Sequence, residues 1–204
     1  MRKAILISLF SLLALPLAAA GQSYSEGSDY RVAERERTLS DEPKEVVEFF
    51  WYGCGGCYAF LPAAESWKDS LPDDVAFLRV PAVLNPRWRE HGKAFYVAEA
   101  LDMVEDIHGP MFEAMHEQRR AINDQDSMRE FFVEQGADPD EFDAAYGSFE
   151  VDAKLRRAEN LARRFQIRST PSVVVNGKYV TNLGDAGGVD GLVDLGNYLL
   201  NRDD

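Results

Sequence analysis

The run Val46–Tyr52 constrains the fold of this chain more than any other segment. Its apolar residues are continuous instead of alternating, and β-branched and aromatic types dominate, which is typical of a strand buried on both faces of a sheet. A glycine-rich turn follows with Cys54 and Cys57, the only cysteines in the chain. The apolar positions that come next at helical spacing are Phe60, Ala64 and Trp67. The segment therefore predicts a buried strand, a tight turn and a helix in succession.

A second strand is expected at about Val75–Val80, and the pattern then changes. Residues 86–165 are rich in Ala, Glu, Arg, Met and Phe, and apolar residues recur every three or four positions, as in helices. One apolar stripe contains Phe95, Ala98, Leu101 and Val104, and others contain Phe131, Phe142, Phe149 and Leu155. We expect breaks between helices at Gly109-Pro110, Gly136 and Asp138-Pro139.

Strand-like sequence returns after Arg168. The stretch STPSVVVNGKYVTN contains a β-branched strand, Asn176-Gly177 and a second short strand, and Asn-Gly favours a two-residue hairpin turn. A final helix is expected in VDGLVDLGNYLL, where a shared face is formed by Leu192, Leu195 and Leu199. The order strand, helix, strand, helical block, hairpin, helix predicts an α/β domain interrupted by a helical insertion.

The first twenty residues have the features of a cleaved export signal. Two basic residues precede an apolar run, Ala4–Leu17, and small residues follow at Ala18–Ala20. The run is shorter than the about 20 residues of a membrane span, and the alternative is an uncleaved membrane anchor. We expect a mature start near Gly21, followed by a loosely held polar arm over residues 21–40. No later segment is long and apolar enough to cross a membrane.

Acidic residues outnumber basic residues by 35 to 22, which gives a net charge of −13. A nucleic-acid partner would call for clustered Lys and Arg, so we expect none. We interpret the acidity as a source of solubility.

The two cysteines lie where a buried strand meets a helix, which places Cys54 at the helix N-terminus. Unpaired backbone N–H groups and the helix dipole stabilise an anion there, and such placement lowers a cysteine pKa from about 8.5 to roughly 3.5–7.5. We predict that Cys54 is the exposed, attacking thiol. Cys57, one turn into the helix, is expected to be the shielded, resolving thiol of a redox-active pair.

Two other interpretations of the cysteine pair are open. A structural disulfide in so small a loop would barely constrain the unfolded chain. A zinc site needs more ligands, and the only histidines, His91, His108 and His116, fall in the helical block with no ligand-like motif that includes the cysteines. We expect no metal and no other cofactor.

Glu48 is a lone carboxylate inside the apolar run. Its neighbours on both sides are apolar, so no alternation turns its side chain towards water. Burial raises the pKa of a carboxylate because it disfavours the charged form, and near Cys57 this group could give or take the proton of that thiol. The alternative is a strand-end residue that reaches solvent past the edge of the sheet.

Two segments together, EFFWYGCGGCYAF and STPSVVVNGKYV, resemble the periplasmic thiol:disulfide interchange proteins of the DsbA family. The resemblance spans essentially the whole mature chain and implies a thioredoxin fold with an inserted helical domain. We expect a signal peptide at 1–20, the first half of the fold with its N-terminal arm at 21–84, the helical insertion at 85–166 and the second half at 167–204.

The resemblance also implies roles for single residues. By itself, Pro171 marks only the start of a strand, because few X–Pro bonds in folded proteins are cis. The family's cis-proline, which faces the disulfide and pairs with substrate backbone, falls on Pro171, with Thr170 before it. The attacking and resolving cysteines of the family fall on Cys54 and Cys57, and its buried acidic residue falls on Glu48.

The chain departs from the family pattern beside its sulfurs. Gly55-Gly56 stands between the cysteines, where typical DsbA proteins have Pro-His. Thr170 stands where oxidases often have Val and isomerase relatives have Thr. Both departures concern the redox poise of the pair and not the exchange chemistry.

We therefore expect an exported, periplasmic oxidoreductase that introduces disulfide bonds into folding proteins bearing thiols. The resemblance implies reoxidation by a membrane partner of the DsbB type. Residues 21–40 are too few for the dimerisation domain of the isomerases, so we expect a monomer. A disulfide isomerase or reductase of the same fold is one alternative, and a non-catalytic peptide-binding module is another.

Overall fold

The computed structural model describes residues 23–202, so the expected signal peptide and Gly21 lie outside the described residues. Its five-stranded sheet has the order β1-β5-β4-β2-β3. The strands are β1 (Arg31–Val32), β2 (Lys44–Phe50), β3 (Val75–Pro81), β4 (Ser172–Val175) and β5 (Tyr179–Asn182). The helices are α1 (Gly55–Ser70), η1 (Pro86–Trp88), α2 (Arg89–Ala100), α3 (Val104–His116), α4 (Gln125–Glu134), α5 (Pro139–Tyr146), α6 (Phe149–Arg164) and α7 (Val189–Leu200).

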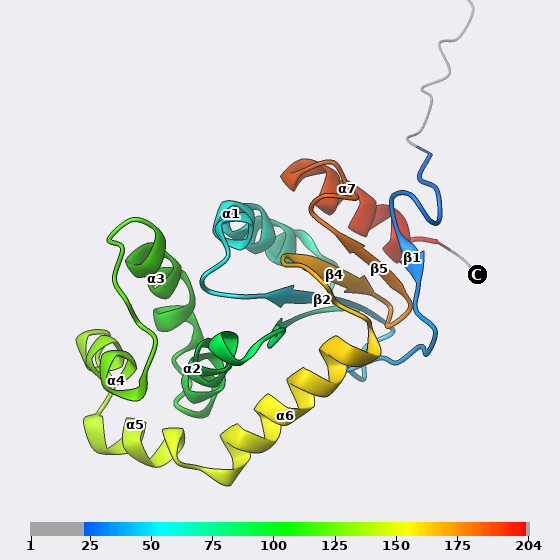
Figure 1. Cartoon of the computed structure of the whole chain (residues 1–204). Helices are drawn as coiled ribbons and strands as arrows, with labels where there is room; N and C mark the ends of the chain where they lie inside the picture. The colour runs from blue at the N-terminus through cyan, green and yellow to red at the C-terminus, as the bar shows by residue number, and fades with distance from the viewer. Residues whose placement is uncertain (1–22, 203–204) are drawn as a thin grey trace, which may run out of the picture.

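The strand β2 lies inside the sheet and carries the site at its end. It pairs in parallel with β3 and antiparallel with β4, and every residue after Lys44 is buried. Helices α1 and α7 cover one face of the sheet, and α6 runs along the other (Figure 1). This two-sided cover is the reason for the continuous apolar run predicted as a strand buried on both faces. The chain leaves β2 and turns directly into α1.

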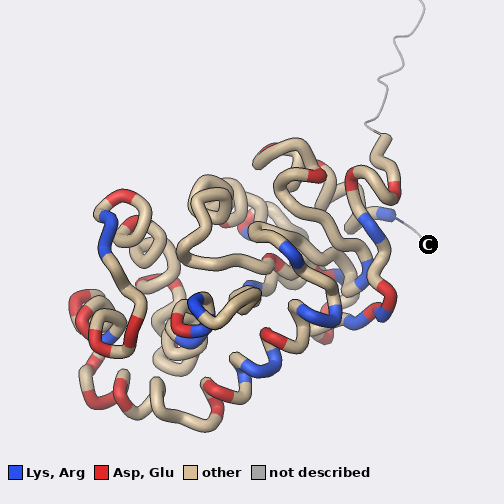
Figure 2. The backbone as a smooth tube through the Cα atoms, in the orientation of Figure 1, with Lys and Arg blue, Asp and Glu red and all other residues tan. Residues whose placement is uncertain are grey.

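The helical block from η1 to α6 lies between β3 and β4 in the sequence, as predicted. Its helices α2–α5 form a separate group beside the sheet, and α6 leads back to β4 (Figure 1). Acidic residues predominate on α4 and α5 (Figure 2). No helix within residues 23–202 has both the length and the apolar character that a membrane crossing requires.

Two expected helix breaks are present and one is wrong. α4 ends just before Gly136, and α5 begins at Pro139 with Asp138 as its N-cap. Gly109-Pro110, however, lies inside α3. Proline there removes the backbone donor for the carbonyl of Asp106, and Asp106 is exposed, so water can take the place of that donor.

The predicted apolar stripes also need correction. The stripe from Phe95 to Val104 spans two helices, because α2 ends at Ala100 and the chain reverses at Asp102, whose φ is 56°. Phe149 is not part of the core, since it begins α6 with 81% of its surface exposed.

The N-terminal arm is docked and not loosely held, in contrast to the prediction. Its β1 pairs antiparallel with β5, and Tyr30 and Ala33 are buried. The buried carboxylate of Glu45 accepts hydrogen bonds from the backbone N–H groups of Leu39 and Ser40 at 2.8 Å. The pairing of β1 with β5 comes from residues far along the chain, which a polar composition does not reveal.

The hairpin between β4 and β5 forms where Asn176-Gly177 predicts it, with φ angles of 52° and 62°. The Lys178 N–H donates to the Val175 carbonyl at 3.0 Å, which closes the turn. The strands pair again only from Tyr179, so the loop is one residue longer than predicted. The carbonyl of Lys178 instead accepts a hydrogen bond from the Ala33 N–H at 2.7 Å. Lys178 is therefore bonded to the N-terminal arm and not to β4 through this carbonyl.

Candidate active site

Cys54 is the N-cap residue of α1, so the first turn of that helix fixes its sulfur. The Cys57 backbone N–H donates to Cys54 Sγ at 3.2 Å, and Cys54 Sγ donates to the Thr170 carbonyl at 3.2 Å. The pKa of Cys54 is lowered to about 6, first by a hydrogen bond with the Cys57 side chain, and further by the side chain of Thr170 and the N–H groups of Cys57 and Gly56, against the effect of burial. At neutral pH this half-buried sulfur is mostly thiolate, and the bond to the Thr170 carbonyl belongs to its protonated form.

Cys57 has the opposite character, although it is only one helical turn away. It is 1% exposed, and burial raises its pKa far above the usual range, with a further increase from the neighbouring Cys54 sulfur. Both cysteines are free thiols in this structure. One sulfur is therefore poised to attack and the other holds its proton.

The Thr170-Pro171 segment faces the cysteine turn, and its peptide bond is cis, as the resemblance implies. A Cβ atom added to Gly56 would lie 3.3 Å from Pro171 Cδ and 3.3 Å from Leu183 Cδ2. Gly55, by contrast, faces open space. The two glycines thus occupy different environments, one against the proline segment and one free.

Glu48 is 2% exposed, and its strand is flanked by β3 and β4, so the alternative of a side chain that reaches solvent past the sheet edge is wrong. It lies opposite Arg79 in the parallel pairing of β2 with β3, and Glu48 Oε2 accepts from Arg79 Nε at 3.3 Å. Burial raises the pKa of Glu48 to about 7, although Arg79 opposes the shift. The negative charges of Glu65 and Cys54 add to it.

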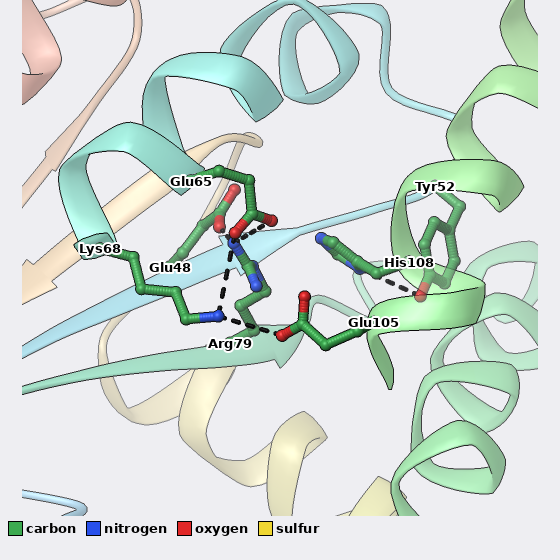
Figure 3. A network of polar contacts seen from close by, with 7 residues as sticks. All are labelled: Glu48, Tyr52, Glu65, Lys68, Arg79, Glu105 and His108. Carbon is green, nitrogen blue, oxygen red and sulfur yellow. Dashed lines mark hydrogen bonds and ion pairs between the residues drawn. The ribbon is translucent and has the colours of Figure 1, made fainter. Parts of the chain in front are cut away.

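Arg79 and Glu65 are site residues that the sequence analysis missed. Glu48 from β2 and Glu65 from α1 both point toward Arg79 (Figure 3), and Arg79 Nη2 donates to Glu65 Oε1 at 2.7 Å. Lys68 Nζ then links Glu65 Oε2 at 3.9 Å with Glu105 Oε1 on α3 at 3.0 Å. A signal was present, because Arg79 is the one cation in the apolar strand β3, as Glu48 is the one carboxylate in the apolar run Val46–Tyr52.

Tyr52 and two histidines were also missed. His108 Nδ1 lies 3.1 Å from Tyr52 Oη (Figure 3), and His116 Nε2 lies 2.8 Å from the Tyr52 carbonyl. Burial holds the pKa of His108 well below its usual range, so the ring is neutral. Within residues 23–202 no three His, Cys, Asp or Glu side chains gather as metal ligands. These histidines instead support the turn that leads from β2 into α1.

The arrangement is suited to thiol–disulfide exchange. A thiolate attacks a disulfide sulfur, and the departing sulfur is released more easily when its charge is stabilised. Cys54 meets both demands through the helix N-terminus. Glu48, near half protonation at neutral pH, is a group that can hold or release one proton beneath the pair.

Comparison with known proteins places this geometry in a wider context. Residues 74–195 match the family model described as DSBA-like thioredoxin domain. The chain is 35% identical over 205 residues to the thiol:disulfide interchange protein DsbA of Pseudomonas aeruginosa strain PAO1, with 100% of this chain and 97% of that protein covered.

Solved structures agree with this similarity. The crystal structure of Pseudomonas aeruginosa DsbA superposes with a TM-score of 0.83 at 35% identity, covering 87% of this chain and 93% of that one. A Proteus mirabilis DsbA complex with the non-covalently bound peptide PWATCDS gives a TM-score of 0.74 at 25% identity, covering 89% and 100%. The fold of the DsbA structures is therefore shared over 87% to 89% of this chain.

Proposed function

The chain belongs to the DsbA family of thioredoxin-fold thiol:disulfide interchange proteins, and on that premise we propose that it donates its Cys54–Cys57 disulfide to folding proteins in the periplasm. The observation that carries the proposal is the difference in acidity between two thiols one helical turn apart. A thiolate stabilised at Cys54 favours the reduced protein, and a stabilised reduced state makes the pair an oxidant.

The proposed reaction starts from the oxidised pair. A substrate thiolate attacks Cys54 Sγ, the Cys54–Cys57 bond breaks, and Cys57 leaves and takes a proton, for which Glu48 is the nearby donor. A mixed disulfide then joins Cys54 to the substrate. The second substrate thiolate attacks the substrate sulfur of this bond and releases Cys54 as a thiolate. The substrate gains a disulfide, and the protein is reduced by two electrons.

We propose that Thr170 and Pro171 hold the extended backbone of the substrate next to Cys54. Support comes from the hydrogen bond between Cys54 Sγ and the Thr170 carbonyl, which places this segment beside the reacting sulfur. The peptide bound by the Proteus mirabilis relative supports a polypeptide substrate. A membrane protein of the DsbB type as reoxidant, and a monomeric state, are further parts of the proposal.

The decisive experiment uses a reduced, unfolded protein with two thiols. The oxidised wild type should form the disulfide of this substrate. When the same substrate is supplied in its disulfide form, reduced C57S should attack it through Cys54, release one substrate thiol and accumulate the mixed disulfide, and C54S should do neither. Unchanged activities in C54S would favour a non-catalytic peptide-binding module. The equilibrium of Cys54–Cys57 with glutathione separates an oxidase from the alternative isomerase or reductase, which would hold a more reducing pair.

Export is proposed from the basic start and Ala18–Ala20, with cleavage near Gly21. Mass spectrometry of protein from the cell envelope should find a mature N-terminus there. A species that retains residues 1–17 would indicate a membrane anchor.

A further inference from the structure

Arg79 lies opposite Glu48 in the sheet with its side chain only 7% exposed, and it pairs with two carboxylates at once. Its Nε donates to Glu48 from β2 at 3.3 Å, and its Nη2 donates to Glu65 from α1 at 2.7 Å. An arginine keeps its charge at all physiological pH values. One permanent positive charge is therefore divided between two groups that can each lose a proton.

The two carboxylates differ in their access to water. The Glu48 side chain is 3% exposed, whereas that of Glu65 is 37% exposed and also faces Lys68. Burial penalises a charge much more at Glu48 than at Glu65. Glu65 takes the shorter bond to Arg79 and Glu48 the longer one, so the guanidinium is shared unequally between them.

We propose that Glu65 is a positioning residue of the exchange reaction, which acts through Arg79 to set the pH at which Glu48 gives up its proton. The inference rests on the proposed function for its consequence in exchange, because Glu48 is the proposed proton donor for Cys57. The link between the carboxylates themselves does not depend on catalysis.

The other charged and titratable groups around Glu48 do not substitute for Glu65. The cysteines come from the start of α1, Tyr52 follows β2, and β4 brings Val173 opposite Glu48. From α3, Glu105 reaches the network only through Lys68, and His108 is neutral. The residues that α7 buries are Leu192, Leu195, Gly196, Leu199 and Leu200. Glu65 is the carboxylate that shares the guanidinium.

The direction of the effect follows from charge. In the wild type, the negative Glu65 offsets Arg79 and helps to raise the pKa of Glu48 to about 7. E65Q removes that charge and leaves the guanidinium for Glu48 alone. Ionised Glu48 is then better stabilised, so its pKa falls.

The test is a carboxyl-carbon NMR titration of Glu48 in the reduced, full-length mature protein. E65Q should lower the Glu48 midpoint by roughly half to one pH unit, as expected when one nearby charge is removed from a partly screened site. D69N is the matched control, because Asp69 is an exposed carboxylate on the same helix, and the ion pairs of Arg79 are with Glu48 and Glu65. E65D, which keeps the charge on a shorter side chain, should give an intermediate midpoint.

An unchanged midpoint in both Glu65 variants, or an equal shift in D69N, would overturn the inference. A second measurement concerns exchange. The pH profile of the rate of substrate oxidation should shift to lower pH in E65Q. The profile of the double variant E48Q/E65Q should be the same as that of E48Q. A protein that oxidises no dithiol substrate would refute the proposed function, while the titration would still decide the role of Glu65.

Discussion

Cys54 and Cys57 show how one helical turn separates two identical side chains. Cys54 is the N-cap residue of α1, where backbone N–H groups point at its sulfur. Cys57 lies inside the helix and is buried. The first environment stabilises a thiolate, and the second removes water from a thiol. The reactivity of each cysteine is thus a property of its position.

We predict a large difference in alkylation between the two thiols of the reduced protein. With a pKa of about 6, Cys54 is mostly thiolate at about pH 6.5, while buried Cys57 remains protonated. Iodoacetamide followed by peptide mass spectrometry should label Cys54 at least about ten-fold faster. Equal rates would contradict the assignment of the attacking sulfur.

E48Q should make the protein more stable in alkaline solution and slower in exchange. The pKa of Glu48 is raised in the folded state to about 7, so its contribution to stability is complete below the unfolded value of 4.5 and is lost as pH rises through 7. Gln does not titrate, so E48Q should gain up to about 3 kcal/mol over the wild type at high pH and nothing at low pH. Urea unfolding across pH measures this gain, and parallel curves would show that Glu48 does not titrate as stated.

G56H tests how the intervening residues set the redox poise. Histidine beside Cys57 should help to hold the Cys54 thiolate, lower its pKa and shift the glutathione equilibrium towards the reduced protein. The new Cβ would lie 3.3 Å from Pro171 and Leu183, so these side chains must give slightly. G55A, which enters open space, is the control. No change in either quantity in G56H would mean that the dipeptide does not set the poise.

At the scale of elements, the β4–β5 hairpin near the end of the chain packs against the N-terminal arm. Its turn lies against the N-terminal arm, where the Arg37 N–H donates to the Gly177 carbonyl at 3.0 Å and a Cβ on Gly177 would lie 2.2 Å from the Arg37 carbonyl oxygen. Glycine is required here twice, for its φ of 62° and for this close approach.

G177A should therefore destabilise the fold more than a comparable change elsewhere. The matched control is G136A, because Gly136 also has a positive φ but nothing within 4 Å of an added Cβ. We expect about 1–2 kcal/mol from backbone strain alone in G136A and at least about 3 kcal/mol in G177A, where the arm must also move. Chemical unfolding measures both, and equal losses would show that the arm does not press on the turn.

At the scale of the molecule, the redox state of one turn is linked to the stability of the whole chain. In the reduced protein, the lowered pKa of Cys54 adds stability that is complete above the unfolded value of 9 and is lost as pH falls through about 6. The oxidised protein has no thiol to titrate. The disulfide closes too small a loop to constrain the unfolded chain strongly.

The reduced protein should therefore gain stability over the oxidised protein as pH rises from about 6 to 9. The gain is at most about 1.4 kcal/mol per pH unit, and less because the sulfur is half exposed and partly screened. Melting temperatures of both forms across this range measure it. A gap that does not change with pH would contradict the stabilised thiolate.

The sequence by itself determined the features that depend on neighbouring residues. The apolar run of β2, the cysteine turn at the start of α1 and the Asn176-Gly177 hairpin each follow from local periodicity and turn chemistry. The burial of Glu48 followed from its apolar neighbours in the same way. The error at Gly109-Pro110 is instructive, because a local rule failed where solvent could satisfy the freed carbonyl.

Only the tertiary structure decided which distant groups meet at the site. Thr170 reaches Cys54 across 116 positions, and Arg79 reaches Glu48 across 31, through the order and register of the strands. Periodicity shows that a strand is buried but not which strand lies beside it, and a shift of register by one residue would turn Arg79 to the other face of the sheet. The same holds for the docked arm, whose polar sequence pairs with β5 only because that edge is free. The partner of Glu48, and with it the control of its proton, is therefore a property of the folded sheet.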